Sequence, residues 1–203
     1  VLETASVAHN ARLESSSRDE AIQSPQRHLE VAIALLKQVV DSVPGSPLAL
    51  GVTGQMHGLL CVNWRRRALT PLITWQDRRT APLCEELERE GWGAHVTETT
   101  GLLIDPYFSA TKMAWLLSNV AGLREKAERN EVCFGTIDSF LLYKLTGGDL
   151  HVTDASNAAR TMLFDIRKGS WDPDLLDRLG IPTAILPEVR DNRGDLGQVR
   201  EDA

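Results

Sequence analysis

The sequence predicts an α/β fold. Short apolar runs typical of strands alternate along the chain with longer stretches whose apolar residues recur at helical spacing. Gly and Pro turns separate these segments, and no internal repeat or low-complexity tract interrupts them. With 203 residues, of which 42% are hydrophobic and 25% charged, the chain is long enough to bury a sizeable core in one large or two small domains.

The first half of the chain predicts one long helix and several strands. Residues 1–7 alternate weakly and predict a short strand. Ser24 is a typical N-cap, Pro25 suits the first helical position, and the helix is expected to end before Pro44. The apolar stripe of this amphipathic helix is Leu29, Ile33, Leu36 and Val40. Strands are then predicted at residues 48–53, 59–63 and 72–75.

The rest of the chain predicts four helices and one buried strand. The strand covers residues 132–135. The first helix is expected at residues 79–90, with Leu83 and Leu87 inward, and the second starts from a cap at Ser109. The third is expected at 136–145, before Gly147-Gly148, and the fourth at 171–179, with Asp172 as its cap.

Composition excludes several classes of protein. The net charge of −6 argues against binding to nucleic acid through phosphate neutralisation. The chain carries no apolar run of about 20 residues and no secretion signal at its start, so we expect a cytoplasmic protein without a membrane partner. Three widely separated cysteines, Cys61, Cys84 and Cys133, are expected to be buried free thiols.

Gln55, Met56 and His57 are the first candidate site residues. They follow an apolar run at a Thr-Gly turn, and α/β folds bind ligands at the carboxyl ends of strands. An amide and an imidazole can both grip a polyhydroxylated ligand. The alternative is that His57 is only a structural turn residue.

Trp75 and Asp77 are the other candidates that side-chain chemistry indicates. An indole face packs well on the C–H face of a sugar or polyol, while a carboxylate accepts from its hydroxyls. Trp75 could instead be a core aromatic, and Asp77 could cap the following helix. Lys112 and Trp115 lie on one helical face and are interpreted as structural.

Four segments together resemble the FGGY family of carbohydrate kinases. They are Gly51 to Gly58, Leu72 to Thr80, Asp105 to Lys112 and Gly135 to Asp138. Gln55-Met56-His57 resembles sedoheptulokinases and xylulokinases, in which it contacts the sugar. The stretch from Trp75 to Val189, including residues 151–164, resembles glycerol kinases, in which the equivalents of Trp75 and Tyr107 line the polyol site.

The resemblance implies a partial ribonuclease-H-like, actin-like ATPase domain over residues 1–203. It implies an ATP- and Mg²⁺-dependent transfer of a phosphoryl group to a sugar or polyol, and it is compatible with a homo-oligomer. Within the 203 residues we find neither the Asp-x-Gly-Thr phosphate hairpin of the family nor its catalytic aspartate, which is expected beyond Ala203. The isolated chain is therefore expected to supply much of the sugar pocket, hold few of the groups that bind ATP and metal, and be inactive alone.

The resemblance points to two substrate classes. Glycerol kinases have an Arg-Glu pair at the positions of Met56 and His57, so the triplet favours a ketose of the xylulose or sedoheptulose type. The remaining segments favour glycerol or another polyol. A non-catalytic sugar-binding or regulatory fragment is the alternative from another class.

Two further patterns have simpler interpretations. The polar residues at 151–164 lack the Gly-x-Ser-x-Gly elbow of a hydrolase and predict a hydrogen-bonded turn that supports the site. The basic run Arg65-Arg66-Arg67 predicts a solvated hairpin tip.

Overall fold

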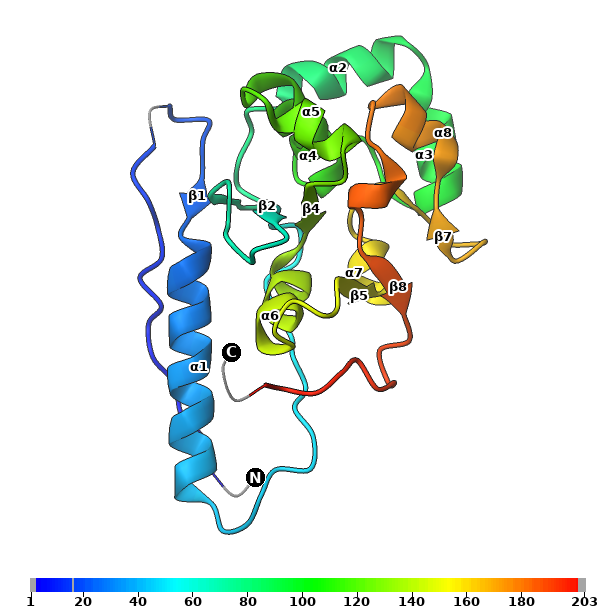
Figure 1. Cartoon of the computed structure of the whole chain (residues 1–203). Coiled ribbons are helices and arrows are strands. Elements are labelled where there is room, and N and C mark those ends of the chain that lie inside the picture. The colour runs from blue at the N-terminus through cyan, green and yellow to red at the C-terminus, as the bar shows by residue number, and fades with distance from the viewer. Residues whose placement is uncertain (1–2, 16, 201–203) are drawn as a thin grey trace.

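A computed structural model of the protein describes residues 3–15 and 17–200. In this part of the chain the strands pair as four two-stranded sheets, and helices lie around them (Figure 1). The helices are α1 (Pro25–Ser42), α2 (Ala81–Arg89), α3 (Trp92–Thr100), α4 (Ser109–Asn119), α5 (Leu123–Glu128), α6 (Ile137–Leu145), α7 (Ala155–Ala158) and α8 (Pro173–Arg178). The strands are β1 (Ile22–Gln23), β2 (Leu60–Asn63), β3 (Leu72–Ile73), β4 (Val132–Gly135), β5 (Val152–Asp154), β6 (Phe164–Asp165), β7 (Ser170–Trp171) and β8 (Glu188–Arg190).

The strands pair mostly between distant parts of the sequence. Strand β2 is antiparallel to β4, with Cys61 opposite Phe134, and β5 is parallel to β8. The pairs β1–β3 and β6–β7 are antiparallel and short. The central pair, β2–β4, separates two hydrophobic clusters, because alternate side chains of a strand point to opposite faces.

The predicted helices are confirmed, with their ends adjusted. Ser24 caps α1 by accepting from the N–H of Arg27 at 3.2 Å, and Asp172 caps α8 by accepting from the N–H of Leu175 at 2.8 Å. After α6 the chain turns through Gly147, whose φ of +72° suits glycine. Ser109 is not a cap, because α4 begins at this residue and its hydroxyl is buried without a hydrogen-bond partner in the described chain.

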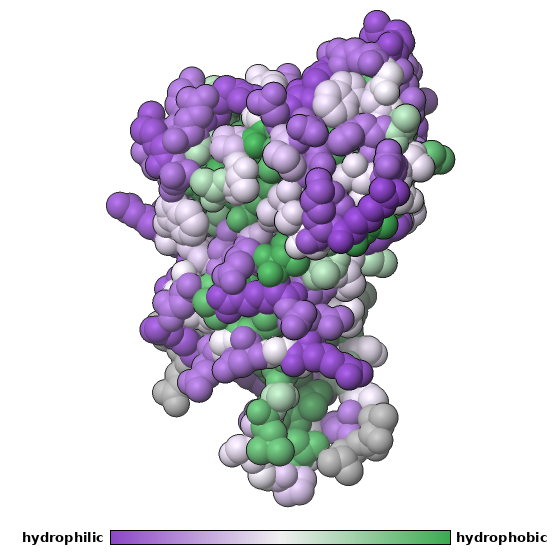
Figure 2. Space-filling view, turned by 90° about the vertical axis from the view of Figure 1, so that its right-hand side faces the viewer, coloured by the Kyte–Doolittle hydropathy of each residue, from purple (hydrophilic) through white to green (hydrophobic). Residues whose placement is uncertain are grey.

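Two predicted strands are absent from the described residues. The prediction at 48–53 is wrong, because this apolar run pairs with no described strand and therefore has no ladder of backbone hydrogen bonds. Leu48 is fully exposed there, and Leu50 is partly exposed. Figure 2 shows hydrophobic surface at the lower end of the molecule, where α1 leads into this segment. Of the predicted strand at 1–7, residues 1–2 lie outside the described residues and 3–7 form no strand.

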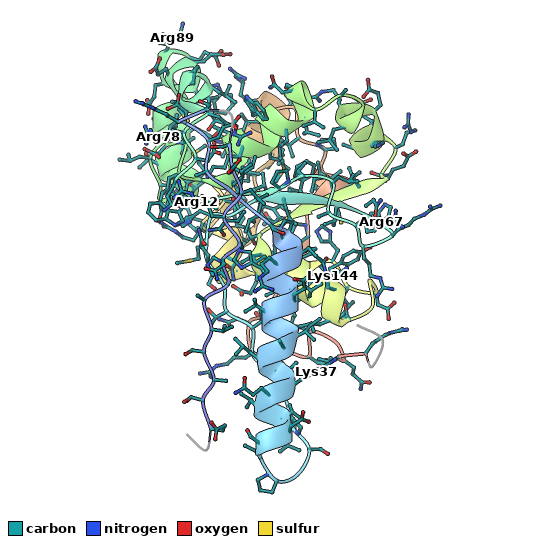
Figure 3. The ribbon with its side chains drawn as sticks, turned by 90° about the vertical axis from the view of Figure 1, so that its left-hand side faces the viewer. Arg12, Lys37, Arg67, Arg78, Arg89 and Lys144 are labelled. Carbon is teal, nitrogen blue, oxygen red and sulfur yellow. The ribbon has the colours of Figure 1, made fainter. Side chains whose placement is uncertain are left out.

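The basic run forms the tip of the hairpin after β2, as predicted. The side-chain oxygen of Asn63 accepts from the N–H groups of Arg65 and Arg67, both at 3.0 Å. Arg67 points away from the body of the protein (Figure 3). The sequence does not predict α3, α5, α7, β1 or β5 to β8. Most of these elements are too short to show a clear period, and α3 has no regular apolar stripe.

Candidate substrate site

His57 lies at the end of an irregular loop that leads into β2. Its φ is +67°, a left-handed conformation that costs a non-glycine residue about 1 kcal/mol or more. The loop is held close to α6 at Gly54, where an added Cβ would lie 2.6 Å from a side-chain carbon of Ile137. His57 is only 2% exposed. A strained, buried residue held in this way is a candidate for function.

The side chains of His57, Tyr107 and Trp75 form a continuous aromatic wall. The rings of His57 and Tyr107 meet edge to face with their centroids 4.2 Å apart, and those of Tyr107 and Trp75 are 5.6 Å apart. Trp75 is 42% exposed and Tyr107 is half-buried, so this wall is accessible to a ligand from the Trp75 side. Three of the six predicted site residues are therefore brought together, although they come from three separate loops.

Gln55 and Met56 lie on the same loop as His57 but further from the core. Gln55 is half-buried, and Met56 is 50% exposed. Neither side chain makes a hydrogen bond or ring contact within the described residues, so the structure leaves both available to a ligand.

Asp77 is fully buried, and its two oxygens are occupied. One accepts from the N–H of Ala21 at 2.8 Å and from the Arg79 guanidinium at 2.7 Å, and the other accepts from the backbone N–H and Nε of Arg79. Asp77 does not cap α2, which begins four residues later with Thr80 at the cap position. Because Asp77 already accepts four hydrogen bonds, it is better suited to joining the loop after β3 to the residue before β1 than to binding a substrate.

Lys112 is a buried cation that links two parts of the site. Its Nζ donates to the carbonyl of Tyr107 at 2.9 Å and, more weakly, to the carbonyl of His57 at 3.5 Å. Burial lowers the pKa of Lys112 to about 8, against the raising effect of Asp77 and Asp105. Trp115, on the same helix, packs under the Arg79 guanidinium at 4.8 Å. Both residues of α4 thus have the structural role that the sequence predicts.

Arg160 contacts the site and was missed by sequence reasoning. Its Nε donates to Nε2 of His57 at 3.3 Å, and its guanidinium carbon lies 5.4 Å from the centre of the Phe108 ring. The only signal in the sequence was a single arginine in the polar stretch 151–164. Asp154 caps α7 just before it, which fits the predicted hydrogen-bonded turn.

His57 is neutral at pH 7. Burial, followed by the charges of Arg160 and Lys112, lowers the pKa of His57 to about 4. Its Nδ1 is buried and has no hydrogen-bond partner within residues 3–15 and 17–200. Leaving such a group unpaired costs about 1–3 kcal/mol.

The polar cluster after β4 is structural. Asp138 accepts from the hydroxyls of Thr136 and Thr153, the latter at 2.8 Å, and burial raises the pKa of Asp138. His151 bonds the carbonyl of Phe134 at 2.8 Å rather than a serine, so these residues form no hydrolase triad. The network ties the start of α6 to β5, beside the turn that presents Arg160.

One group of described residues has metal-ligand spacing, but it does not fit Mg²⁺. Atoms of His95, Asp172 and Asp174 lie within 4.8 Å of one another. Mg²⁺ prefers oxygen ligands, whereas His95 offers nitrogen and Asp172 is already bonded to His95 and the N-terminus of α8. This group of three residues therefore does not fit Mg²⁺.

The three cysteines and the helices also bear on the predictions made from composition. Cys61, Cys84 and Cys133 are free and buried, as predicted, and burial raises the pKa of the Cys84 thiol to about 11. Within the described residues no helix is both long and apolar enough to cross a bilayer.

The structure thus combines a mixed α/β arrangement with an aromatic wall built by three separate loops. The model of the N-terminal domain of the FGGY family of carbohydrate kinases matches residues 1–203. The chain therefore belongs to the FGGY family of carbohydrate kinases, as its sequence motifs indicated.

Relatives and solved structures agree with this assignment. The chain is 56% identical over 157 residues to a glycerol kinase of Xanthobacter autotrophicus, covering 76% of this chain and 31% of the relative. It is 53% identical over 163 residues to one from Cereibacter sphaeroides, covering 79% and 33%. The chain thus spans about a third of the length of these relatives.

Two solved structures confirm the predicted fold class. The Plasmodium falciparum glycerol kinase with ADP superposes with a TM-score of 0.88 at 25% identity, over 95% of this chain and 39% of that one. The gluconate kinase of Lactobacillus acidophilus gives a TM-score of 0.85 at 22% identity, over 95% and 38%. The actin-like ATPase fold is thus shared across kinases that are named for different substrates.

Proposed function

We propose that the whole protein transfers the γ-phosphoryl group of ATP, with Mg²⁺, to a hydroxyl of a small polyol of the glycerol class. In this proposal the described chain supplies much of the polyol pocket. The observation that carries it is the aromatic wall of His57, Tyr107 and Trp75. Identities of 53–56% to glycerol kinases support the choice of polyol.

The wall would bind the carbon skeleton and leave the hydroxyls to polar groups. The exposed face of Trp75 would pack on the C–H bonds of the polyol, and the Tyr107 hydroxyl, which makes no hydrogen bond within the described residues, would bond one oxygen. His57 would bond a second oxygen. The groups that hold ATP and Mg²⁺ and the catalytic aspartate are predicted to lie mostly outside these residues.

A ketose kinase is the second candidate, because by the family resemblance Met56 and His57 take the positions at which glycerol kinases have Arg and Glu. The neutral, partly apolar pair Met56 and His57 leaves more room for the substrate than a charged Arg-Glu pair and makes fewer charge-assisted hydrogen bonds to it. The two candidates differ in the substrate that the whole protein prefers. The non-catalytic alternative predicts sugar binding without turnover.

The test of the proposal is the ratio of specificity constants. We expect kcat/KM of the whole protein for glycerol to exceed those for xylulose and sedoheptulose by at least about tenfold, or about 1.4 kcal/mol. A ketose preferred by the same margin would replace the proposal with the second candidate. Sugar binding with no turnover on any of the three would favour the non-catalytic alternative.

The role of the aromatic wall can be tested with two matched tryptophans. Trp75→Ala is expected to raise KM for the preferred substrate by up to about tenfold, because a stacked aromatic contact contributes about 0.5–1.5 kcal/mol. Trp64 is similarly exposed, at 48% against 42%, but lies at the hairpin tip, so Trp64→Ala should leave KM unchanged. Equal effects of the two changes would remove Trp75 from the site.

A further inference from the structure

His57 is bonded at one ring nitrogen only. Its Nε2 receives a hydrogen bond from Nε of Arg160 at 3.3 Å, and its Nδ1 is buried without a partner in the part of the chain that the structure describes. The ring is enclosed by Tyr107 at 4.2 Å and Phe108 at 5.4 Å.

The nature of the Arg160 donor decides where the proton of His57 lies. A guanidinium carries only N–H donors and cannot accept a hydrogen bond. The Nε2 atom that it contacts must therefore be the unprotonated, accepting nitrogen. Because the buried ring is neutral, its single proton is then on Nδ1.

The result is an N–H donor without an acceptor. Buried polar groups in folded proteins are nearly always hydrogen-bonded, and an exception requires an explanation. A bound substrate would supply the missing acceptor if the side chains over Nδ1 move aside on binding, because this atom is closed to solvent in the structure. The positive charges of Arg160 and Lys112 also lower the pKa of the ring, so they disfavour a second proton on it.

We propose that Arg160 is a positioning residue that holds His57 in its Nδ1–H tautomer, so that Nδ1 donates a hydrogen bond to a neutral oxygen of the substrate. The substrate oxygen is a hydroxyl or carbonyl oxygen of the polyol or sugar. Arg160 acts through His57 and does not itself touch the substrate. The part of this inference that concerns the substrate rests on the proposed function, whereas the tautomer does not.

The tautomer is measured without any substrate. In the whole protein labelled with ¹⁵N-histidine, long-range ¹H–¹⁵N spectra distinguish a protonated Nδ1 from a protonated Nε2, and His57→Ala identifies the signals of His57. We expect the Nδ1–H form for His57 at pH 7. The Nε2–H form, or an even mixture of the two, would overturn the inference.

The dependence on Arg160 is measured with a matched pair of variants. Arg160→Met is expected to shift His57 toward the Nε2–H form or a mixture and to raise KM for the preferred substrate by up to about tenfold, with a smaller change in kcat. The control, Arg167→Met, removes an exposed arginine that pairs with Glu98 at 3.0 Å, and it should change neither quantity. An unchanged tautomer in Arg160→Met would overturn the inference.

A double-mutant cycle separates positioning from direct contact. If Arg160 acts through His57, adding Arg160→Met to His57→Ala should change KM by less than about twofold beyond His57→Ala alone. A further rise of about tenfold would show that Arg160 contacts the substrate itself or supports the site independently of His57, which would overturn the inference. Comparable thermal unfolding of all variants confirms that they are folded.

The inference and the proposed function can fail separately. If the protein phosphorylates none of the sugars and polyols, the proposed function fails while the His57 tautomer and its response to Arg160→Met remain measurable. If glycerol is phosphorylated but His57 is in the Nε2–H form, the function stands and the inference fails.

Discussion

Replacing Lys112 by methionine should change how the stability of the protein depends on pH. The Lys112 side chain is completely buried on α4, and its pKa falls from 10.5 to about 8, chiefly because burial disfavours the charge. Between these two values the unfolded chain binds a proton at this position that the folded chain does not. The free energy of unfolding of the wild type therefore rises with pH across that window.

The magnitude follows from the pKa difference between the folded and unfolded protein. At about 1.4 kcal/mol per pKa unit, the charged Lys112 costs the fold about 3 kcal/mol at pH 7 and about 1 kcal/mol at pH 10. Methionine has a similar volume and no charge, so this cost disappears in the variant. The variant also loses the hydrogen bond that Lys112 donates to the carbonyl of Tyr107 at 2.9 Å. This leaves an unpaired acceptor, which costs about 1–3 kcal/mol.

These opposing terms give a specific expectation for Lys112→Met. At pH 7 the variant should be about as stable as the wild type. Between pH 7 and pH 10 the free energy of unfolding of the variant, taken relative to that of the wild type, should fall by about 2 kcal/mol. Urea unfolding at both pH values, extrapolated linearly to water, measures this difference. Other groups that titrate in this range cancel between the two proteins.

A control on α1 makes the comparison specific. Lys37 is exposed on the lower half of α1 (Figure 3), so Lys37→Met should follow the pH dependence of the wild type. If Lys112→Met also follows the wild type within about 0.5 kcal/mol, Lys112 is not charged and buried as described, and the reasoning fails.

Two further predictions concern His57 and Asp172. Because the pKa of His57 is lowered from 6.5 to about 4, the ring binds its proton less readily in the folded protein. Stability from this group is therefore complete above about pH 6.5 and is lost as the pH falls toward 4, and KM for the preferred substrate should be constant from pH 5.5 to 8. A KM that rises as pH falls through 6.5 would show that His57 has an ordinary pKa. Asp172→Ala removes the 2.8 Å capping hydrogen bond of α8 and should lower the free energy of unfolding by about 0.5–2 kcal/mol. The control, Asp174→Ala, changes an exposed residue of the same helix and should lower it by less than about 1 kcal/mol. Equal losses in urea unfolding would refute the capping role.

The sequence predicts the elements that carry their own local signals. Ser24-Pro25 and Asp172-Pro173 mark helix starts by their chemistry, and both are confirmed. The run at 48–53 has the composition of a strand, yet a strand exists only through a partner, which local composition does not reveal.

The same distinction applies to the site. Trp75 was predicted from the chemistry of its side chain and Tyr107 from the family resemblance, and the structure brings them together. Arg160 was missed because its role depends on proximity to His57, which is 103 residues away in the sequence. Asp77 has the chemistry of a ligand, but its oxygens are taken by partners such as Ala21, which is 56 residues away.

The long sequence separations around His57 also bear on folding. The ring meets Tyr107, its carbonyl meets Lys112 at a separation of 55 residues, and its Nε2 meets Arg160 at a separation of 103. Contacts between such distant residues form only after long loops have closed, so they are among the slower steps of folding. A partly folded chain could contain α1, whose backbone hydrogen bonds are local, and still lack this set of contacts. Ligand binding at the aromatic wall would therefore report on completion of the whole tertiary structure, and would draw incompletely folded molecules toward it by mass action.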